Sequence, residues 1–183
     1  MYVLASKSPR RRELLSLILP EYECQESNVI ESVAEGTPWE RVPAELARQK
    51  ALAVSALRPN DTVIGADTVV VLDGRVLGKP RDAEDAAGML SILSGSRHLV
   101  LTGVCIAGGG SSKTFLETTE VEFYPLSPEL IDWYVSTGDP MDKAGAYGIQ
   151  DQGCVLVKAI HGDYFNVMGL PVSRLARELG IVK

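Results

Sequence analysis

The stretch "TVIGADTVVVLDGRVLGKP", residues 62–80, decides the fold of this chain. Its first half carries apolar residues on both alternating faces, which is typical of a central strand in a sheet that is covered on both sides. Asp73 and Gly74 match the two-residue turn of a β-hairpin, after which a short return strand is expected. The stretch therefore predicts a hairpin whose long strand lies inside a sheet.

Helical and extended patterns alternate on either side of this hairpin. Further strands are predicted over 2–5, 98–108, 114–126 and 154–160, helices over 10–19, 43–57, 83–93, 129–138 and 171–180, an extended segment over 22–32 and an irregular connection over 139–153. Adjacent strands mixed with helices favour an α/β fold with a mixed sheet over a regular βαβ repeat. The chain of 183 residues is long enough for one domain, residues 1–183, or for two small lobes that share a core.

Composition and charge exclude several classes of protein. The net charge of -6 argues against a nucleic-acid polymer as the partner, because such domains usually present a basic face. No apolar stretch is long enough to span a membrane, and the N-terminus lacks the order of a signal peptide, so we expect a cytoplasmic protein. Cys24, Cys105 and Cys154 are widely spaced, which predicts buried, reduced thiols and neither a disulfide nor a zinc site.

A carboxylate interrupts the apolar pattern of the long strand. Alternation puts Asp67 on the same face as Val63, Gly65 and Val69, with the glycine leaving room beside it. Burial of an unpaired carboxylate is energetically costly, so we expect a cation close to it. Asp67 therefore belongs either to a functional site or to a structural ion pair.

Three arginines, Arg10, Arg11 and Arg12, come directly after Ser8 and Pro9, which suit the N-cap and the first position of a helix. Cations in a first helical turn oppose the helix dipole and cost about 0.3–1 kcal/mol each. Free N–H groups at a helix start and guanidinium groups both bind phosphate oxygens, however. The arginines thus indicate an anion site, and a solvated surface run is the alternative.

Two lysines and a glutamate extend this set of charges. Lys50 falls within the apolar stripe of the helix predicted over 43–57, so its ammonium group either meets a partner or extends to solvent along its methylenes. Lys79 follows the hairpin, Glu31 ends the extended segment, and each of them could equally be solvated. Together with Asp67, these groups are typical of a site where carboxylates hold a hard divalent cation and basic groups hold a polyphosphate.

Other motifs for nucleotide binding or hydrolysis are missing. The strings "GGGSSK" and "GRVLGKP" both lack the spacing of a P-loop and are interpreted as turns. The histidines, His98 and His161, are far apart in a chain without a G-x-S-x-G motif, so a Ser-His-Asp hydrolase is not favoured. Both histidines are interpreted as structural.

Five strings, taken together and in order, resemble the Maf family of nucleoside triphosphate pyrophosphatases: "LASKSPRRRELL", "GADTVVVLDGRVLGKP", "LSGSRHLVLTGV", "DKAGAYGIQ" and "GDYFNVMGLPV". The resemblance covers nearly the whole chain. It implies a mixed, twisted sheet with flanking helices, in two lobes around a deep cleft, related in architecture to inosine triphosphate pyrophosphatases. It also implies hydrolysis of a nucleoside triphosphate to the monophosphate and pyrophosphate with a divalent cation, Mg²⁺ or Mn²⁺, and it is compatible with a homodimer.

The resemblance also implies roles for individual residues. It matches Asp67 to the proton acceptor, Thr68, Arg11 and Gln150 to positions tied to substrate choice, and Glu31, Lys50 and Lys79 to positions that bind metal and phosphate. We expect Glu31 and Asp67 to hold the metal, and Arg10 to join Arg11 and the lysines in offsetting the charge of the leaving pyrophosphate.

The string "DKAGAYGIQ" resembles the branch of the family that acts on dTTP and UTP, rather than the branch that cleaves 7-methyl-GTP. Pyrimidine triphosphates, including modified ones, are therefore the expected substrates. Asp151 is a departure, because many relatives have glycine after the glutamine. The alternative to an enzyme is a nucleotide-binding regulator of cell division, since the family is named for an association with septum formation.

Overall fold

The computed structural model describes residues 1–183, which divide into two compact units. Unit 1 comprises Met1–Thr68, Thr102–Glu117 and Gly169–Lys183, and unit 2 comprises Val69–Leu101 and Thr118–Met168. The division agrees with the two lobes that the sequence analysis expected. The deep cleft and the organisation of residues 1–183 as a single domain stay predictions.

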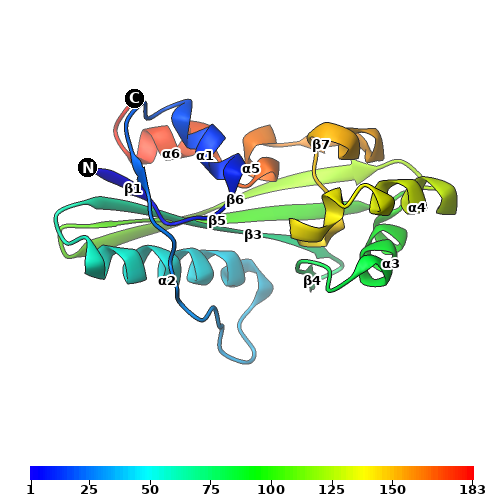
Figure 1. Cartoon of the computed structure of the whole chain (residues 1–183), viewed down its shortest axis with the longest axis horizontal. Helices are drawn as coiled ribbons and strands as arrows, with labels where there is room; N and C mark the ends of the chain where they lie inside the picture. Colours follow the sequence, from blue (N-terminus) through cyan, green and yellow to red (C-terminus); the bar gives the residue numbers. More distant parts are fainter. The chain divides into compact units, whose positions relative to one another are not determined.

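Strands and helices follow the predicted order closely (Figure 1). The strands are β1 (Tyr2–Leu4), β2 (Glu23–Cys24), β3 (Thr62–Leu72), β4 (Arg75–Leu77), β5 (Arg97–Gly108), β6 (Ser111–Phe123) and β7 (Val157–His161). The helices are α1 (Pro9–Ser16), α2 (Val42–Leu57), α3 (Ala83–Leu93), α4 (Pro128–Ser136), α5 (Tyr164–Met168) and α6 (Val172–Glu178), with short 3₁₀ helices η1 (Trp39–Arg41), η2 (Asp139–Asp142), η3 (Ala144–Ala146) and η4 (Asp151–Leu156). No helix has the combination of length and apolar character that crossing a membrane requires.

The strands form one mixed sheet, which confirms the predicted α/β class. Their order is β2-β1-β3-β5-β6-β7, with β4 paired to β3. Strand β1 runs parallel to β2 and to β3, whereas β4 is antiparallel to β3 and β7 is antiparallel to β6. The predicted hairpin turn is present, because Asp73 and Gly74 have φ angles of 49° and 78°, as a two-residue turn with left-handed backbone requires.

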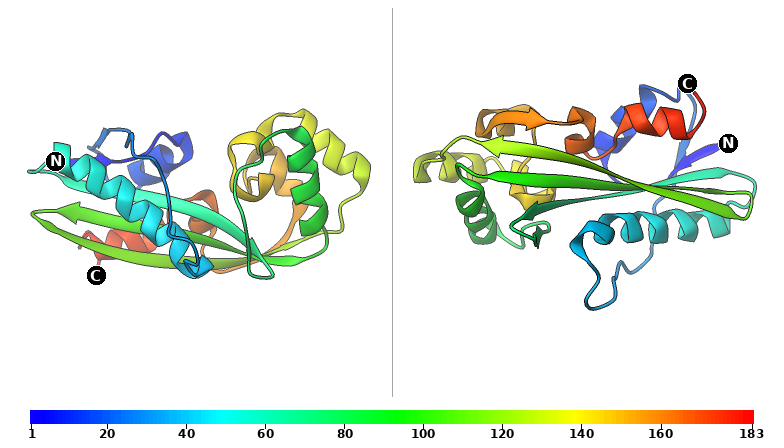
Figure 2. Two further views of the ribbon diagram at one scale, coloured as in Figure 1. Left: turned by 90° about the horizontal axis from the view of Figure 1, so that it is seen from below. Right: turned by 180° about the vertical axis from the view of Figure 1, so that it is seen from behind.

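Helices cover both faces of the sheet in unit 1, with α2 on one face and α1 and α6 on the other (Figures 1 and 2). Helix α2 lies unusually close to the strands. A Cβ atom added at Gly65 of β3 would lie 2.8 Å from the backbone nitrogen of Ala51, and Ala47 and Ala51 are fully buried. The glycine and the small helix residues thus let the backbones of α2 and β3 approach each other.

A second core fills unit 2, where α3 packs against α4. His98 of β5 is buried in this core and contacts the rings of Phe123 and Tyr147 edge to face, with centroids 4.9 and 5.3 Å away. Its Nε2 atom lies 2.7 Å from the hydroxyl oxygen of Tyr147. The histidine therefore has the structural surroundings that the sequence analysis expected.

The burial of His98 predicts a pH dependence of stability. Burial lowers the pKa of His98 to about 4 from 6.5, so the unfolded chain binds more protons between these values and stability falls as the pH falls through that window. The slope reaches about 1.4 kcal/mol per pH unit for one group. Urea unfolding at several pH values should show a shallower slope in His98→Gln than in the wild type. An equal slope in His98→Gln and in the wild type would contradict the assignment.

Several local expectations were wrong. Strands β5 and β6 are joined by Gly109 and Gly110 alone, because both adopt a positive φ and close a two-residue turn, so Ser111 to Lys113 belong to β6. Helix α1 ends at Ser16, since the N–H group of Leu17 already closes the last turn. Helix α5 was not predicted. Of the cysteines, which are all free thiols, Cys105 is buried as expected but Cys24 and Cys154 are exposed.

Candidate active site

An ion pair joins α2 to β3 within unit 1. The Nζ atom of Lys50 donates a hydrogen bond to Oδ1 of Asp67 over 2.6 Å, and only 12% and 14% of the two side chains are exposed. The close approach of α2 at Gly65 brings the lysine alongside the strand. The cation expected beside Asp67 is therefore confirmed, and the ammonium group of Lys50 points inward rather than to solvent.

The second carboxylate of the set converges on the same ammonium group. Oε2 of Glu31 lies 3.0 Å from Nζ of Lys50. The segment that carries Glu31 is hydrogen-bonded to α2 at the following residue, Ser32. The side chain of Gln49 donates to the carbonyl oxygen of Ser32 over 2.6 Å and accepts from its N–H group over 3.3 Å. A segment without regular structure thus brings a glutamate to the ion pair, although the side chain of Glu31 is 46% exposed.

This geometry fits a divalent cation that is shared with a ligand. Glu31 and Asp67 both approach one cationic atom, so their oxygens can converge on a single positive charge. No group of three or more His, Cys, Asp or Glu side chains is placed to enclose a metal ion by itself. Mg²⁺ commonly takes one or two carboxylates and completes its shell with water and phosphate oxygens, which matches this donor set.

Arg11 is the arginine that the fold draws inward. Its Nε atom donates to the carbonyl oxygen of Gly169 over 2.8 Å, and its guanidinium NH2 group donates to Oγ1 of Thr68 over 3.0 Å. Ser8 caps the helix as predicted, since its hydroxyl accepts the N–H group of Arg11 over 3.4 Å. Burial lowers the pKa of Arg11, while the nearby carboxylate of Asp67 acts in the opposite direction. A partly buried positive charge therefore lies beside the ion pair.

Two residues that the sequence analysis did not single out complete this arrangement. Oγ1 of Thr102 lies 3.0 Å from Oγ1 of Thr68, and Thr102 is fully buried. Gly169 supplies the carbonyl oxygen for Arg11. The signal for Thr102 was present, because a threonine interrupts the apolar run "LVLTGVCIA" of β5 in the way that Asp67 interrupts β3. Nothing in the local sequence around Gly169 marks it as a partner of residue 11.

The remaining predicted residues lie in two places. Arg10 is half-buried in the first turn of α1, where its charge lowers the pKa of Arg11. Lys79 and Gln150 belong to unit 2, with Lys79 exposed after β4 and Gln150 half-buried before η4. The structure thus brings Glu31, Lys50 and Asp67 together and joins Arg11 to Thr68 within unit 1.

The fold and this polar arrangement belong to a known class of proteins. The model of the family described as Maf-like protein matches residues 1–181, so the chain belongs to the Maf-like family. The dTTP/UTP pyrophosphatase of Bacillus pumilus (strain SAFR-032) is 48% identical over 183 residues, which cover 97% of this chain and 94% of that protein. The dTTP/UTP pyrophosphatase of Bacillus velezensis (strain DSM 23117 / BGSC 10A6 / LMG 26770 / FZB42) is 51% identical over 178 residues, which cover 97% of this chain and 94% of that protein.

A solved structure shares the fold at much lower sequence identity. The structure of a HAM1 protein from Coxiella burnetii matches with a TM-score of 0.54 over 99% of this chain and 98% of its own, at 14% identity. The likeness concerns the fold, and it agrees with the mixed sheet and flanking helices predicted from the sequence.

Proposed function

We propose that the protein is a nucleoside triphosphate pyrophosphatase that hydrolyses dTTP and UTP to the monophosphate and pyrophosphate. The observation that carries this proposal is the convergence of Asp67, Glu31 and Lys50 beside the inward Arg11, in a chain about half identical to dTTP/UTP pyrophosphatases. The reaction would remove unwanted pyrimidine triphosphates, canonical or modified, from the nucleotide pool.

We assign the role of general base to Asp67. Its carboxylate is held in place by the hydrogen bond from Lys50, and a water molecule beside it would lose its proton to the carboxylate while its oxygen attacks the α-phosphorus. The bond from the α-phosphorus to the bridging oxygen then breaks, and that oxygen leaves with the pyrophosphate. Such a transfer needs positioning and charge stabilisation more than covalent chemistry from the protein.

Basic groups would offset the charge of the leaving pyrophosphate. Glu31 and Asp67 would hold Mg²⁺ or Mn²⁺, which when bound neutralises phosphate oxygens and acidifies water. Arg10 and Arg11, at the first turn of α1, would bind phosphate through their guanidinium groups. We assign phosphate binding to Lys50 and Lys79 as well, from their match to the family.

The base would be selected by a side-chain amide. We assign this role to Gln150, with Arg11 and Thr68 as further positions that affect substrate choice. Thymine and uracil present a carbonyl acceptor at O4 next to an N–H donor, and a glutamine amide offers one donor and one acceptor to match them. Asp151 adopts a left-handed backbone with φ 51°, a conformation that glycine and, less readily, aspartate tolerate. The aspartate is therefore compatible with the left-handed backbone at this position.

A panel of triphosphates tests the proposed function. The purified protein should release pyrophosphate, and no orthophosphate, from dTTP and UTP with Mg²⁺, and should turn over purine triphosphates and 7-methyl-GTP much more slowly. Preference for 7-methyl-GTP would assign the chain to the sibling activity instead. Tight binding of dTTP without pyrophosphate release would favour a nucleotide-binding regulator over an enzyme.

Arg11→Lys is expected to raise the KM for dTTP by about tenfold or more, because hydrogen bonds from a charged group contribute about 1.5–3 kcal/mol each. A lysine keeps the positive charge but cannot donate in two directions from a planar fork, so the bonds to Gly169 and Thr68 cannot both be kept. Steady-state kinetics measure the change. The same substitution at the exposed neighbour Arg12 is the matched control and should leave KM unchanged. Equal behaviour of the two variants would show that the inward arginine has no part in binding.

The cytoplasmic location and the homodimer expected from the sequence stay predictions that accompany this function. Fractionation of cells and the mass of the purified protein in solution test them separately.

A further inference from the structure

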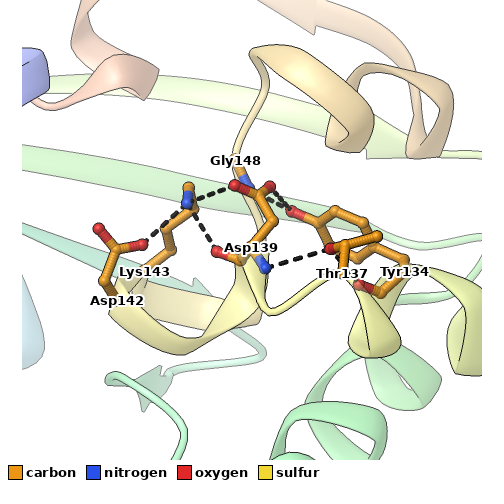
Figure 3. A network of polar contacts seen from close by, with 6 residues as sticks. All are labelled: Tyr134, Thr137, Asp139, Asp142, Lys143 and Gly148. Carbon is orange, nitrogen blue, oxygen red and sulfur yellow. Dashed lines mark hydrogen bonds and ion pairs between the residues drawn. The ribbon is translucent and has the colours of Figure 1, made fainter.

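A buried tyrosine in unit 2 holds the segment that precedes Gln150 (Figure 3). Tyr134 of α4 is fully buried, and its hydroxyl donates to Oδ2 of Asp139 over 2.6 Å while it accepts the N–H group of Gly148 over 3.0 Å. Burial and the neighbouring carboxylate raise the pKa of Tyr134, so the hydroxyl stays protonated and both bonds persist at neutral pH. The tyrosine therefore fixes the backbone two residues before the glutamine.

Charged groups fix the tyrosine's partner in turn. Nζ of Lys143 donates to Oδ1 of Asp139 over 2.8 Å, to the carbonyl oxygen of Asp139 over 2.6 Å and to Oδ1 of Asp142 over 2.8 Å. The N–H group of Asp139 donates to Oγ1 of Thr137 over 3.1 Å. The side chain of Asp139 is only 20% exposed, and its carboxylate is held by both Lys143 and Tyr134. A carboxylate held in this way can keep the tyrosine hydroxyl in a fixed position.

The same network contacts the chain on both sides of the glutamine. The stem of Lys143 lies across Gly148, where an added Cβ would meet its Cε atom at 2.7 Å. On the other side, a Cβ at Gly153 would lie 2.8 Å from the hydroxyl oxygen of Tyr134 and would collide with the carbonyl oxygen of Gly148. Gly148 and Gly153 therefore close a tight turn around Tyr134, and residues 149–152 lie between the two fixed points.

The glutamine itself is not fixed by a capping bond. Gln150 precedes η4 without a side-chain hydrogen bond to the helix start, and it is half-buried. A glutamine amide can turn over and exchange its donor and acceptor, so its chemistry alone matches adenine as well as thymine. Discrimination then depends on where the backbone holds the amide relative to the base.

We propose that Tyr134, together with Asp139 and Lys143, is a positioning residue for base selection: the network holds the turn from Gly148 to Gly153 so that the amide of Gln150 meets a pyrimidine. This inference rests on the proposed function. It adds residues that contact neither the phosphates nor the reacting atoms, and it predicts an effect on selectivity rather than on chemistry.

Tyr134→Phe tests the inference, because it removes the hydroxyl and keeps the ring. The KM for dTTP should rise about tenfold, as expected for loss of a positioning hydrogen bond, while kcat stays within about twofold and the KM for dATP does not change. Gly148→Ala, which pushes against the Lys143 stem, should change selectivity in the same direction. Tyr147→Phe is the matched control, since it removes the hydroxyl of another buried tyrosine, which is bonded to His98 instead.

Binding of the product nucleotides separates this inference from the proposed function. Calorimetry with dTMP and dAMP needs no turnover, and the preference for dTMP should fall in Tyr134→Phe and persist in Tyr147→Phe. If the wild type prefers dTMP and Tyr134→Phe keeps that preference, the inference is overturned and the proposed function stands. If the wild type shows no preference for pyrimidines, both are overturned. A uniform loss of affinity for both nucleotides would assign Tyr134 a merely structural role.

Discussion

Asp67→Asn is expected to lower kcat for dTTP by about 10²–10⁴-fold, the usual contribution of a general base. An amide cannot accept a proton at neutral pH, so deprotonation of the attacking water loses its acceptor. The amide oxygen of asparagine still accepts a hydrogen bond from Lys50, so the contact between α2 and β3 should persist. Steady-state kinetics of pyrophosphate release measure the first effect, and urea unfolding shows whether the fold is intact.

Asp61→Asn provides the matched control for this prediction. Asp61 also forms short ion pairs, with Arg58 at 2.6 Å and with the amino group of Met1 at 3.2 Å, but these lie at the start of β3 rather than beside Lys50. The control should retain nearly full activity, whatever it loses in stability. Substantial activity in Asp67→Asn, or an equal loss in both variants, would remove Asp67 from the mechanism.

Chelation of divalent cations is expected to stop turnover, with a loss of at least about a thousandfold, and added Mg²⁺ or Mn²⁺ should restore it. Glu31, Asp67 and a triphosphate are all anionic, so a divalent cation between the carboxylates and the phosphates would offset their mutual repulsion. Pyrophosphate release with and without a chelator measures the effect. Full activity in the chelator would show that the basic side chains suffice.

Metal binding by the carboxylates can be tested through the Mg²⁺ concentration that activity requires, separately from the maximal rate at saturating Mg²⁺. Glu31→Gln should raise the concentration of Mg²⁺ required for half-maximal activity by about tenfold, because a neutral amide is a weaker ligand than a carboxylate for a hard cation. Glu35→Gln is the matched control, since Glu35 is exposed on the same connection between β2 and α2. If both variants need the same concentration as the wild type, Glu31 is not a ligand.

The site could be predicted from the sequence wherever a residue breaks a local pattern. Asp67 interrupts an apolar strand, and Lys50 interrupts an apolar helix stripe, so burial by itself required that each find an opposite charge. The glycine beside Asp67 indicated available room, and that room is filled by α2. The hairpin turn at Asp73 and Gly74 followed from turn chemistry alone.

The partners of Arg11 could not be predicted in this way. Arg11 bonds to Gly169, which is 158 residues further along the chain, and to Thr68, which is 57 residues further. The partner at position 169 is a backbone carbonyl group. Every residue type has such a group, so the residue type at position 169 does not predict the contact. The same holds for Gly148, whose N–H group bonds to Tyr134. Long-range pairing of this kind depends on the completed fold.

The hydrogen bond between Arg11 and Gly169 can form only late in the synthesis of the chain. Ribosomes make the chain from its N-terminus, so the guanidinium of Arg11 exists long before its carbonyl acceptor does. A nascent polypeptide that has already formed β3, β5 and β6 still has this arginine without one of its partners until residue 169 emerges. Arg11 of unit 1 therefore completes its hydrogen bonds late in the synthesis of the chain.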